Sequence, residues 1–484
     1  MKQINLMEDI LIIGGGINGA GIARDAVGRG LKVTLIEKGD LASQTSSWST
    51  KLIHGGIRYL ENYEFRLVRE SLKEREALRQ IAPHITKPIR FVMPHVSNLR
   101  PLWFIRFGLW LYDWLGGSYT LPKSKLVNLQ RDFLDNPLEE NFIKGFAYSD
   151  LFVDDARLVL INIQDAKLRG AKIHTQKSVI AAIRHSDHWE VKLDSGQIIK
   201  TKLIINASGP FALETLNKIC NVKTNKRLRL VQGSHILVNQ LYKGDQAYIL
   251  QLEDKRIIFL IPYLGKYTLI GTTDHEVKSY VNPTISEIEI EYLIKAVNSF
   301  VKNKISKENI VWTYAGIRPL LEDFNQNASK VTRDYTFELN EGGAPILTIF
   351  GGKLTTYRKL AEHALEKISK FFDIPNKSWT GNEKLPGSNS YSVDQLKFDL
   401  PEMLIQRLIN TYGDKILIIQ KYYNNLSKGG EKITEDLYEF EISYLVQEEL
   451  VTKIDDILFR RTKLGINFPE EKKDQLANLI KKYS

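Results

Sequence analysis

Residues 10–21, ILIIGGGINGAG, decide the fold of this chain. A short apolar run ends in glycines, and small apolar residues then recur at helical spacing, which indicates a strand, a tight turn and a helix. Gly14 allows the turn, Gly16 lets the backbone approach a pyrophosphate, and Gly19 lets the helix pack closely on the strand. The free N–H groups at the start of the helix attract the anion.

A second strand and a hydroxyl-rich loop extend this pattern. Residues 33–36 end at Glu37, at the spacing where an acidic residue binds ribose hydroxyls in dinucleotide-binding domains. The alternative, a chance glycine turn, is disfavoured because strand, turn, helix, strand and acid follow in the required order. Residues 41–51, LASQTSSWSTK, then continue along the pyrophosphate, which favours FAD over NAD. The loop supplies three candidate cofactor contacts, namely Ser46, Ser47 and Lys51.

Composition limits the chemistry. The 484 residues suffice for two or three domains with their own cores. Cys220 is the single cysteine, which excludes an internal disulfide and a multi-cysteine metal or iron–sulfur site. His185 and His188 form the closest histidine pair, and with no third ligand nearby in the sequence we predict no metal site. Redox chemistry therefore requires an organic cofactor.

Charge and hydropathy indicate where the protein acts. The net charge of +10 suggests an anionic partner, which could be a phosphorylated substrate, a lipid surface or nucleic acid. An apolar run of 18 residues is absent and Met1 leads directly toward a strand, so we expect neither a membrane span nor a signal peptide. We expect a cytoplasmic protein that can lie on a membrane surface.

Several longer motifs, from about residue 8 to 375, carry a specific family resemblance. In them the chain resembles the bacterial aerobic, FAD-dependent glycerol-3-phosphate dehydrogenases. The motifs are GGGINGAG from 14, TSSxSxKLIHGGxRYLE from 45, VDDARLVL at 153–160, GSH at 233–235, EDKR at 253–256, GTTD at 271–274, WTYAGIRPL at 312–320, TRDYT at 332–336 and FGGKLTTYRKLAEHALEK at 350–367. The resemblance implies an α/β fold: a glutathione-reductase-like FAD-binding Rossmann domain, an antiparallel-sheet substrate domain and a helical C-terminal domain.

The domain boundaries follow from that fold and from composition. We expect a discontinuous FAD-binding domain over residues 1–90, 147–227 and 310–380. Alternating strand-like runs between 228 and 274 predict the antiparallel sheet of a substrate-covering domain, over 91–146 and 228–309. Charged, helical composition predicts a cap domain over 385–484. A helix over 65–82 is expected to expose its charges, including Glu70, Lys73, Glu74 and Glu76.

Site residues come from the motifs and from what alcohol oxidation requires. The strand before Gly209 is expected to return the chain to the cofactor. The alternative is an ordinary connection from a strand to a loop. Gly352, Leu354 and Thr355 open a helix whose N-terminus favours negative charge on a flavin. The resemblance implies a substrate-binding set of Arg58, Tyr59, Thr273, Arg333 and Lys353, and a catalytic set of Arg318, His54 and His235. Arg318 is expected to face the C2 oxygen, and either histidine could be the base.

The resemblance also implies partners: sn-glycerol 3-phosphate as substrate, and membrane quinone as electron acceptor for a peripheral protein on the cytoplasmic side of the inner membrane. Residues 354–371 and 102–115 are candidates for contact with an anionic membrane surface, against burial in the core or a dimer contact. We expect no nucleic-acid partner, and a homodimer stays open. The rivals are a glycerophosphate oxidase that forms peroxide, an RNA-associated flavoprotein and a silent FAD-binding scaffold.

Overall fold

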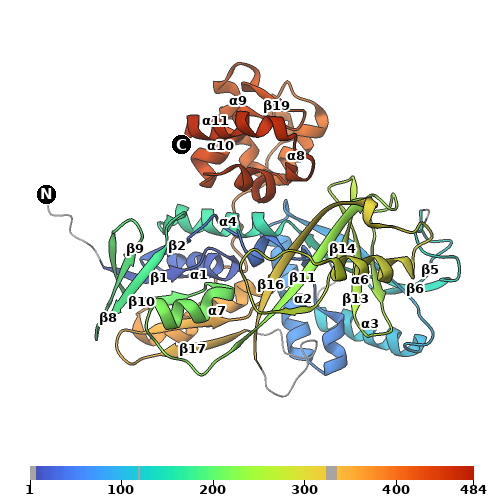
Figure 1. The fold of residues 1–484 in the computed structure, drawn as a ribbon, viewed down its shortest axis with the longest axis horizontal. Helices are drawn as coiled ribbons and strands as arrows, with labels where there is room; N and C mark the ends of the chain where they lie inside the picture. The colour runs from blue at the N-terminus through green and yellow to red at the C-terminus, as the bar shows by residue number, and fades with distance from the viewer. Residues whose placement is uncertain (1–6, 118–119, 134, 323–334, 376) are drawn as a thin grey trace.

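The computed structural model describes residues 7–117, 120–133, 135–322, 335–375 and 377–484, without the side chains of Arg58, Glu61 and Asn62. Two sheets lie side by side, and a helical C-terminal body sits on one side of them (Figure 1). In the described part of the chain, no helix combines the length and apolar character needed to cross a bilayer.

The first sheet is the predicted dinucleotide-binding sheet. Its strands β1, β2, β7, β10 and β18 run parallel, β17 is antiparallel to β18, and the β8–β9 hairpin adjoins β10. In spatial order the strands are β17 (Thr336–Asn340), β18 (Ile346–Phe350), β10 (Ile198–Asn206), β1 (Glu8–Ile13), β2 (Val33–Ile36) and β7 (Lys172–His174). In addition, β9 (Trp189–Leu193) pairs with β10, and β8 (Val179–Arg184) pairs with β9. The central strands are buried, as their apolar runs predict.

Three helices make the core beneath this sheet. The helix α1 (Ile17–Gly28) packs against α4 (Asp155–Leu168) and α7 (Tyr357–Ile368). Gly21 makes the contact with α7 close, because a Cβ there would lie 2.7 Å from the Tyr357 ring. Three segments that lie far apart in the sequence therefore form one core.

The second sheet confirms the antiparallel strands predicted between 228 and 274. It is antiparallel except for the β4–β12 pair. Its path is β15 (His275–Val277), β11 (Leu228–Asn239), β14 (Tyr267–Gly271), β13 (Ile257–Tyr263), β12 (Ala247–Gln251), β4 (Thr86–Pro94), β6 (Lys144–Val153) and β3 (Leu52–Ile53), with β16 (Ile310–Leu321) on β11 and β5 (Lys125–Asn128) on β6. The helix α6 (Glu287–Asn298) packs on β11 and β13.

The domain boundaries expected at 90, 146 and 310 do not follow this sheet. The first two fall inside β4 and β6. The strand β16, assigned from the sequence to the FAD-binding domain, pairs along its length with β11 in the second sheet. The second sheet therefore contains strands from both of the domains expected from the sequence.

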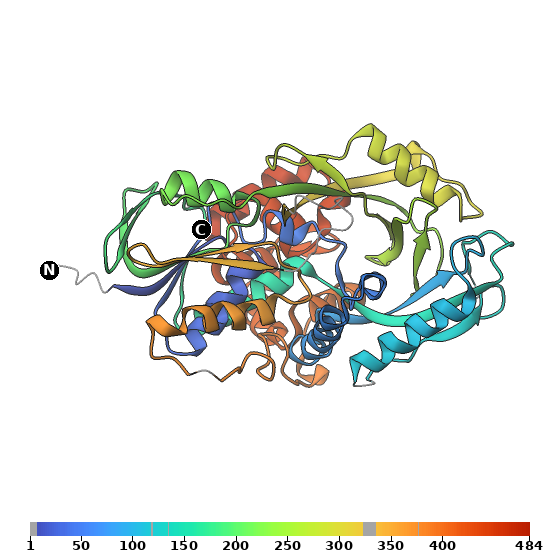
Figure 2. The same cartoon turned by 90° about the horizontal axis from the view of Figure 1, so that it is seen from below.

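Helices dominate the C-terminal body, around a small apolar core of their own. They are α8 (Glu402–Tyr412), α9 (Ile416–Asn425), α10 (Glu439–Glu449) and α11 (Lys473–Tyr483), with a short hairpin of β19 (Lys432–Thr434) and β20 (Leu437–Tyr438). The opposite face of the molecule carries α2 (Phe65–Ile81) and α3 (Leu102–Gly116) (Figures 1 and 2).

Two sequence expectations about helices are wrong. Glu74 and Glu76 on α2 are buried, and Glu74 accepts hydrogen bonds from the guanidinium of Arg358 on α7. The expected membrane-facing segment 354–371 contains α7, whose apolar residues Tyr357 and Leu360 are fully buried in the core. The helical spacing that looked amphipathic therefore marks a face that packs on α1.

Candidate functional site

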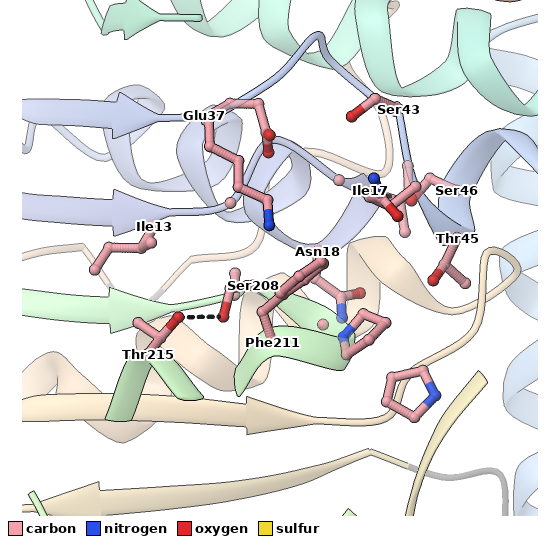
Figure 3. Close-up of a pocket in the computed structure, with 18 of the residues that line it drawn as sticks. Ile13, Ile17, Asn18, Glu37, Ser43, Thr45, Ser46, Ser208, Phe211 and Thr215 are labelled. Atoms are coloured by element: carbon pink, nitrogen blue, oxygen red, sulfur yellow. Dashed lines mark hydrogen bonds between the residues drawn. The ribbon is translucent and has the colours of Figure 1, made fainter. Parts of the chain in front are cut away.

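A cavity of about 370 Å³ lies where β1 and β2 end (Figure 3). Glycines shape its floor, since Gly14 has φ +114° and a Cβ there would lie 2.6 Å from the carbonyl oxygen of Ala207. At Gly19 a Cβ would lie 2.0 Å from the Gly14 carbonyl oxygen. The cavity is lined by Gly14, Gly16 and Gly209, which the sequence assigned to the cofactor. The glycine turn therefore lets a ligand approach the backbone closely.

Glu37 lines the same cavity from the end of β2 (Figure 3). Its Oε2 accepts from the Gly15 N–H at 2.7 Å and its Oε1 from the Gly39 N–H at 2.8 Å. These bonds fix the carboxylate in one orientation, although burial raises its pKa. Each oxygen keeps a second lone-pair direction, which suits the two hydroxyls of a ribose.

Of the three cofactor contacts predicted in the loop after Glu37, one lines the cavity and two lie in the core. Ser46 lines the cavity, and its Oγ accepts from the Ile17 N–H at 3.0 Å. Ser47 and Lys51 are buried outside the lining of this cavity. The Nζ of Lys51 donates to Oδ1 of Asp155 at 2.9 Å and to the Ser47 carbonyl at 3.0 Å. Lys51 thus holds the loop in place from behind.

The turn from Gly351 to Thr356 separates β18 from α7, which begins at Tyr357, later than the sequence indicates. Gly352 has φ +105°, a conformation that favours glycine, and it lines the cofactor cavity together with Leu354. The amide of Asn18 donates to the Gly351 carbonyl at 3.1 Å. This bond connects the turn to the start of α1.

A second cavity of about 620 Å³ adjoins the first. The two share Thr45, Ser49, Pro319, Gly352 and Leu354 in their linings. Its other walls come from the second sheet, from the segment that carries His54 and Tyr59, and from Thr355 in the turn before α7. A ligand in one cavity can therefore contact a ligand in the other.

Lys353 supplies a positive charge to this second cavity. Its Nζ lies 3.9 Å from the centroid of the Tyr59 ring and is buried, with no hydrogen-bond partner among the described residues. A buried ammonium group without a hydrogen-bonded partner is costly. An anionic ligand in the cavity would remove that cost.

Arg318 lies on β16 with its guanidinium in the second cavity. It donates to Oδ1 of Asp274 at 2.5 Å and to Oγ1 of Thr272 at 3.1 Å. Gly233 on the paired strand β11 makes room, because a Cβ there would lie 2.3 Å from Nη2 of Arg318. The glycine of the GSH motif thus lets the arginine lie flat across the sheet.

The two candidate histidines occupy different places. His54 lines the second cavity, and its backbone N–H donates to Oγ1 of Thr355 at 3.4 Å. His235 is buried behind the cavity wall, stacked on the ring of Tyr314 at 4.6 Å, and its Nε2 lies 3.0 Å from Oγ1 of Thr50. Burial, followed by the charges of Arg318 and Lys51, holds the pKa of His235 well below its usual range.

For three of the expected substrate-binding residues, Thr273, Arg333 and Arg58, the structure describes no side chain in the lining of the cavity. Thr273 is buried and donates to Oε1 of Glu289 at 2.6 Å, while its neighbour Thr272 lines the cavity. Arg333 lies outside the described residues. The backbone of Arg58 belongs to a short helix, Ile57–Asn62, beside the cavity, and its side chain is outside the described part.

Sequence reasoning missed several residues of the second cavity. Thr50, Glu64, Arg100 and Lys255 line it, although none was singled out. Lys255 belongs to the EDKR motif, which contributed to the family resemblance but was given no role in the site. The other three could not be found by spacing, since their segments meet only in the folded sheet.

The histidine pair on the β8–β9 hairpin does have a third group beside it, so that sequence statement is wrong. His185, His188 and Glu190 bring one ligand atom each within 4.8 Å of one another. The hairpin places Glu190 on the same side as the rings, because side chains two residues apart on a strand share a face. Nζ of Lys200 pairs with this carboxylate at 2.8 Å.

Comparison with known families decides the class of the chain. The model of the FAD dependent oxidoreductase family matches residues 9–358, and the model of the C-terminal domain of alpha-glycerophosphate oxidase matches 378–482. The chain belongs to the FAD-dependent oxidoreductases. The residues fit that cofactor, since the cavity combines a glycine cradle, a fixed acid and a row of hydroxyl groups. FAD is therefore the cofactor, and the resemblance to this family is confirmed.

Relatives refine the comparison. A glycerol-3-phosphate dehydrogenase of Pseudomonas tolaasii is 45% identical, over 98% of this chain and 95% of the relative. A D-erythritol 1-phosphate dehydrogenase of Brucella abortus is 44% identical, over 96% of this chain and 95% of the relative. The solved glycerol-3-phosphate dehydrogenase of Bacillus halodurans, complexed with FAD, is 25% identical with a TM-score of 0.74, over 99% and 94% of the two chains.

Proposed function

We propose that this protein oxidises sn-glycerol 3-phosphate to dihydroxyacetone phosphate and passes the electrons to membrane quinone. The observation that carries the substrate assignment is Lys353, a buried ammonium group without a hydrogen-bond partner among the described residues of the second cavity. Arg318 and Lys255 add positive charge to the same lining. A dianionic phosphate fits this set of donors, and its binding would place the carbon chain beside the cofactor cavity.

The chemistry divides between cofactor and protein. When bound, FAD supplies the atom, flavin N5, that accepts a hydride from C2 of the substrate. Arg318 donates to the C2 oxygen and stabilises the negative charge that develops there as the hydrogen leaves. Asp274 fixes the orientation of Arg318 through its 2.5 Å contact. The N–H groups of the turn before α7 favour negative charge on the cofactor side.

His54 is the general base in this proposal. It lines the substrate cavity, whereas His235 reaches the cavity only through Thr50. A base must lie within hydrogen-bond reach of the proton that it removes, and geometry takes precedence over pKa in that assignment. His235 is then a positioning residue, which remains neutral and orients the Thr50 hydroxyl.

A longer polyol phosphate is a second candidate substrate. The Brucella relative, named as a D-erythritol 1-phosphate dehydrogenase, is nearly as similar as the Pseudomonas glycerol-3-phosphate dehydrogenase. The cavity of about 620 Å³ also has room for more than three carbons, and Glu64 in its lining can accept hydrogen bonds from further hydroxyls. Both substrates share a phosphate and a neighbouring secondary alcohol.

Anaerobic reduction of the bound flavin tests the substrate assignment. The visible absorbance band of oxidised flavin should bleach on addition of sn-glycerol 3-phosphate and stay unchanged with glycerol. D-erythritol 1-phosphate, added in the same way, reports on the second candidate. Equal bleaching by glycerol and its phosphate would contradict a phosphate-binding site. Rapid peroxide formation in air, with indifference to added quinone, would favour the oxidase.

Attachment to a membrane is the remaining part of the proposal, and α3 supports it. The helix buries Ile105, Leu109 and Tyr112 and exposes Trp103, Phe104, Phe107, Trp110 and Trp114 on its other side. Arg106 on the helix and Lys123 and Lys125 after it are also exposed. Exposed aromatic side chains beside cations are typical of a helix that lies in the headgroup region of an anionic leaflet. Segment 102–115 is thus our candidate membrane contact.

A further inference from the structure

The loop between β2 and η1 (Thr45–Ser47) contacts both the cofactor cavity and the C-terminal body. Lys38, Ala42, Ser43 and Gln44 line the cavity from one side of this loop. Asp40 belongs to the same loop, is 3% exposed, and lies outside that lining. Its backbone carbonyl accepts from the Ser43 N–H at 3.2 Å, so the position of Asp40 and that of the lining residues are coupled.

Two adjacent arginines of the C-terminal body bind the Asp40 carboxylate. Nε of Arg460 donates to Oδ2 at 2.5 Å, and Arg461 donates to Oδ2 at 2.6 Å and to Oδ1 at 2.8 Å. Both arginines are buried, and Arg461 also donates to the Glu449 carbonyl at 2.7 Å. Burial alone would raise the pKa of Asp40, and the two guanidinium groups outweigh it and hold that pKa low.

The segment after η1, which carries Ser49 and Lys51, is linked to the same body indirectly, through two adjacent acids. Nζ of Lys463 pairs with Asp154 at 3.1 Å. The next residue, Asp155, accepts from Lys51 at 2.9 Å and from Oγ of Ser49 at 2.7 Å. Arg460 and Arg461 therefore contact the loop directly, and Lys463 is linked to the segment after η1 through Asp154 and its neighbour Asp155.

We propose that the C-terminal domain retains the cofactor: its contact through Arg460 and Arg461 with Asp40 keeps the loop in the conformation that lines the FAD cavity. FAD must then leave faster when this contact is broken, even while the domain stays folded. The effect does not depend on the identity of the substrate. Asp40, Arg460 and Arg461 are positioning residues in this scheme, since they act through the loop.

The test measures FAD release from the holoenzyme. Asp40→Asn keeps the shape of the side chain and removes its charge, which weakens both arginine contacts. Flavin fluorescence after dilution, well below the unfolding temperature, should show release about ten-fold faster or more, since a charge-assisted contact held the loop. Arg460→Lys is the milder second variant, because it keeps the charge and loses the Nε donor. It should accelerate release less.

The matched control breaks a partly buried ion pair that does not contact the loop. Arg407 donates to both oxygens of Glu441 inside the C-terminal body. Arg407→Gln should lower the unfolding temperature but change the FAD release rate by less than about two-fold. Release at the wild-type rate from Asp40→Asn and Arg460→Lys would overturn the proposal. Equal acceleration in all three variants would also overturn it, because it would reflect loss of stability alone.

Discussion

At the scale of single residues, the buried ammonium groups of Lys353 and Lys51 have different surroundings. Lys353 is neutralised by no described side chain, in contrast to Lys51, which holds Asp155. The two lysines show how burial alone does not assign a role. One is satisfied inside the protein and supports the loop, and the other is available for a ligand.

Removing the charge of Lys353 should weaken substrate binding. Lys353→Met keeps the length of the side chain, so the contact with the Tyr59 ring and the fold should persist. We expect KM for sn-glycerol 3-phosphate to rise about ten-fold or more, since a hydrogen bond to a charged group contributes about 1.5–3 kcal/mol. Steady-state kinetics check this. Lys255→Met is the comparison at another position of the lining, and an unchanged KM in Lys353→Met would contradict the phosphate assignment.

The histidines can be separated by their pH dependence. His54→Asn should lower the rate of flavin reduction by a factor of about 10²–10⁴ and abolish the limb of the pH profile that reports the base. His235→Asn should lower the rate less and leave that limb in place. Anaerobic stopped-flow reduction at several pH values checks both. A pH profile that changes only in His235→Asn would reverse the assignment.

In our proposal, Arg318 stabilises the transition state. Arg318→Lys keeps the charge but loses the planar donors that reach Asp274 and the C2 oxygen, so kcat should fall more than KM rises. The ratio of the two effects is the measurement. A rise in KM alone would place Arg318 in the phosphate-binding group.

At the scale of elements, the glycine turn and its flanking strands were predictable, since every step of that motif is local in sequence. The role of α7 was not. Its apolar spacing is the same for a membrane-facing helix as for a core helix, and only the contact with α1 distinguishes them. Glu74 was expected in solvent because its partner, Arg358, lies 284 positions away.

Because α7 is buried, membrane attachment is tested on the exposed face of α3. Replacing Trp103, Trp110 and Trp114 together by serine should lower the fraction bound to vesicles of phosphatidylethanolamine and phosphatidylglycerol by about ten-fold or more. The unfolding temperature should hardly change, since each side chain is more than half exposed. Co-sedimentation is the measurement.

A matched control removes apolar surface elsewhere. Ile180 and Ile183 on β8 are also at least half exposed, and their replacement by serine should leave vesicle binding unchanged. If the tryptophan and isoleucine variants bind equally well, α3 does not mediate attachment. The result would not affect the cofactor or substrate assignments.

At the scale of the whole molecule, His84 marks how the C-terminal region is joined to the rest. It lies between α2 and β4, where Nδ1 contacts Oγ of Ser388 at 3.3 Å. Burial, followed by the charges of Arg157 and Lys415, lowers its pKa to about 3, with Asp154 acting in the opposite direction. The folded protein therefore keeps this histidine neutral.

This shift makes stability depend on pH. Below the ordinary histidine pKa of about 6.5 the unfolded chain takes up a proton that the folded chain refuses, so stability falls between about pH 6.5 and pH 3, by up to about 1.4 kcal/mol per pH unit. His84→Asn removes this term, and its unfolding temperature should fall less steeply with acid. Parallel slopes for the two proteins between pH 8 and pH 5 would contradict the assignment. His235 contributes with the same sign and is present in both.

Only part of the overall arrangement could be predicted from the sequence. The fold class and FAD follow from motifs, and both are confirmed by the family models and by the structure. The buried contacts of the C-terminal body did not follow, since Asp40 and Arg461 carry no signal that pairs them across 421 positions. The strands β4 and β6 similarly cross the expected domain boundaries at 90 and 146, and β16 pairs with a strand of the other expected domain.

The pairing of Asp40 with Arg460 also bears on how the chain is made. Ribosomes add about 5–20 residues per second, so the 420 positions between the two residues correspond to on the order of twenty to eighty seconds of translation. Loops and helices form in microseconds or less, and the nascent loop must therefore wait for its partner. A nonsense mutation just before residue 460 should accordingly yield a chain that has every strand of the Rossmann sheet but is colourless after purification, because the flavin would be lost.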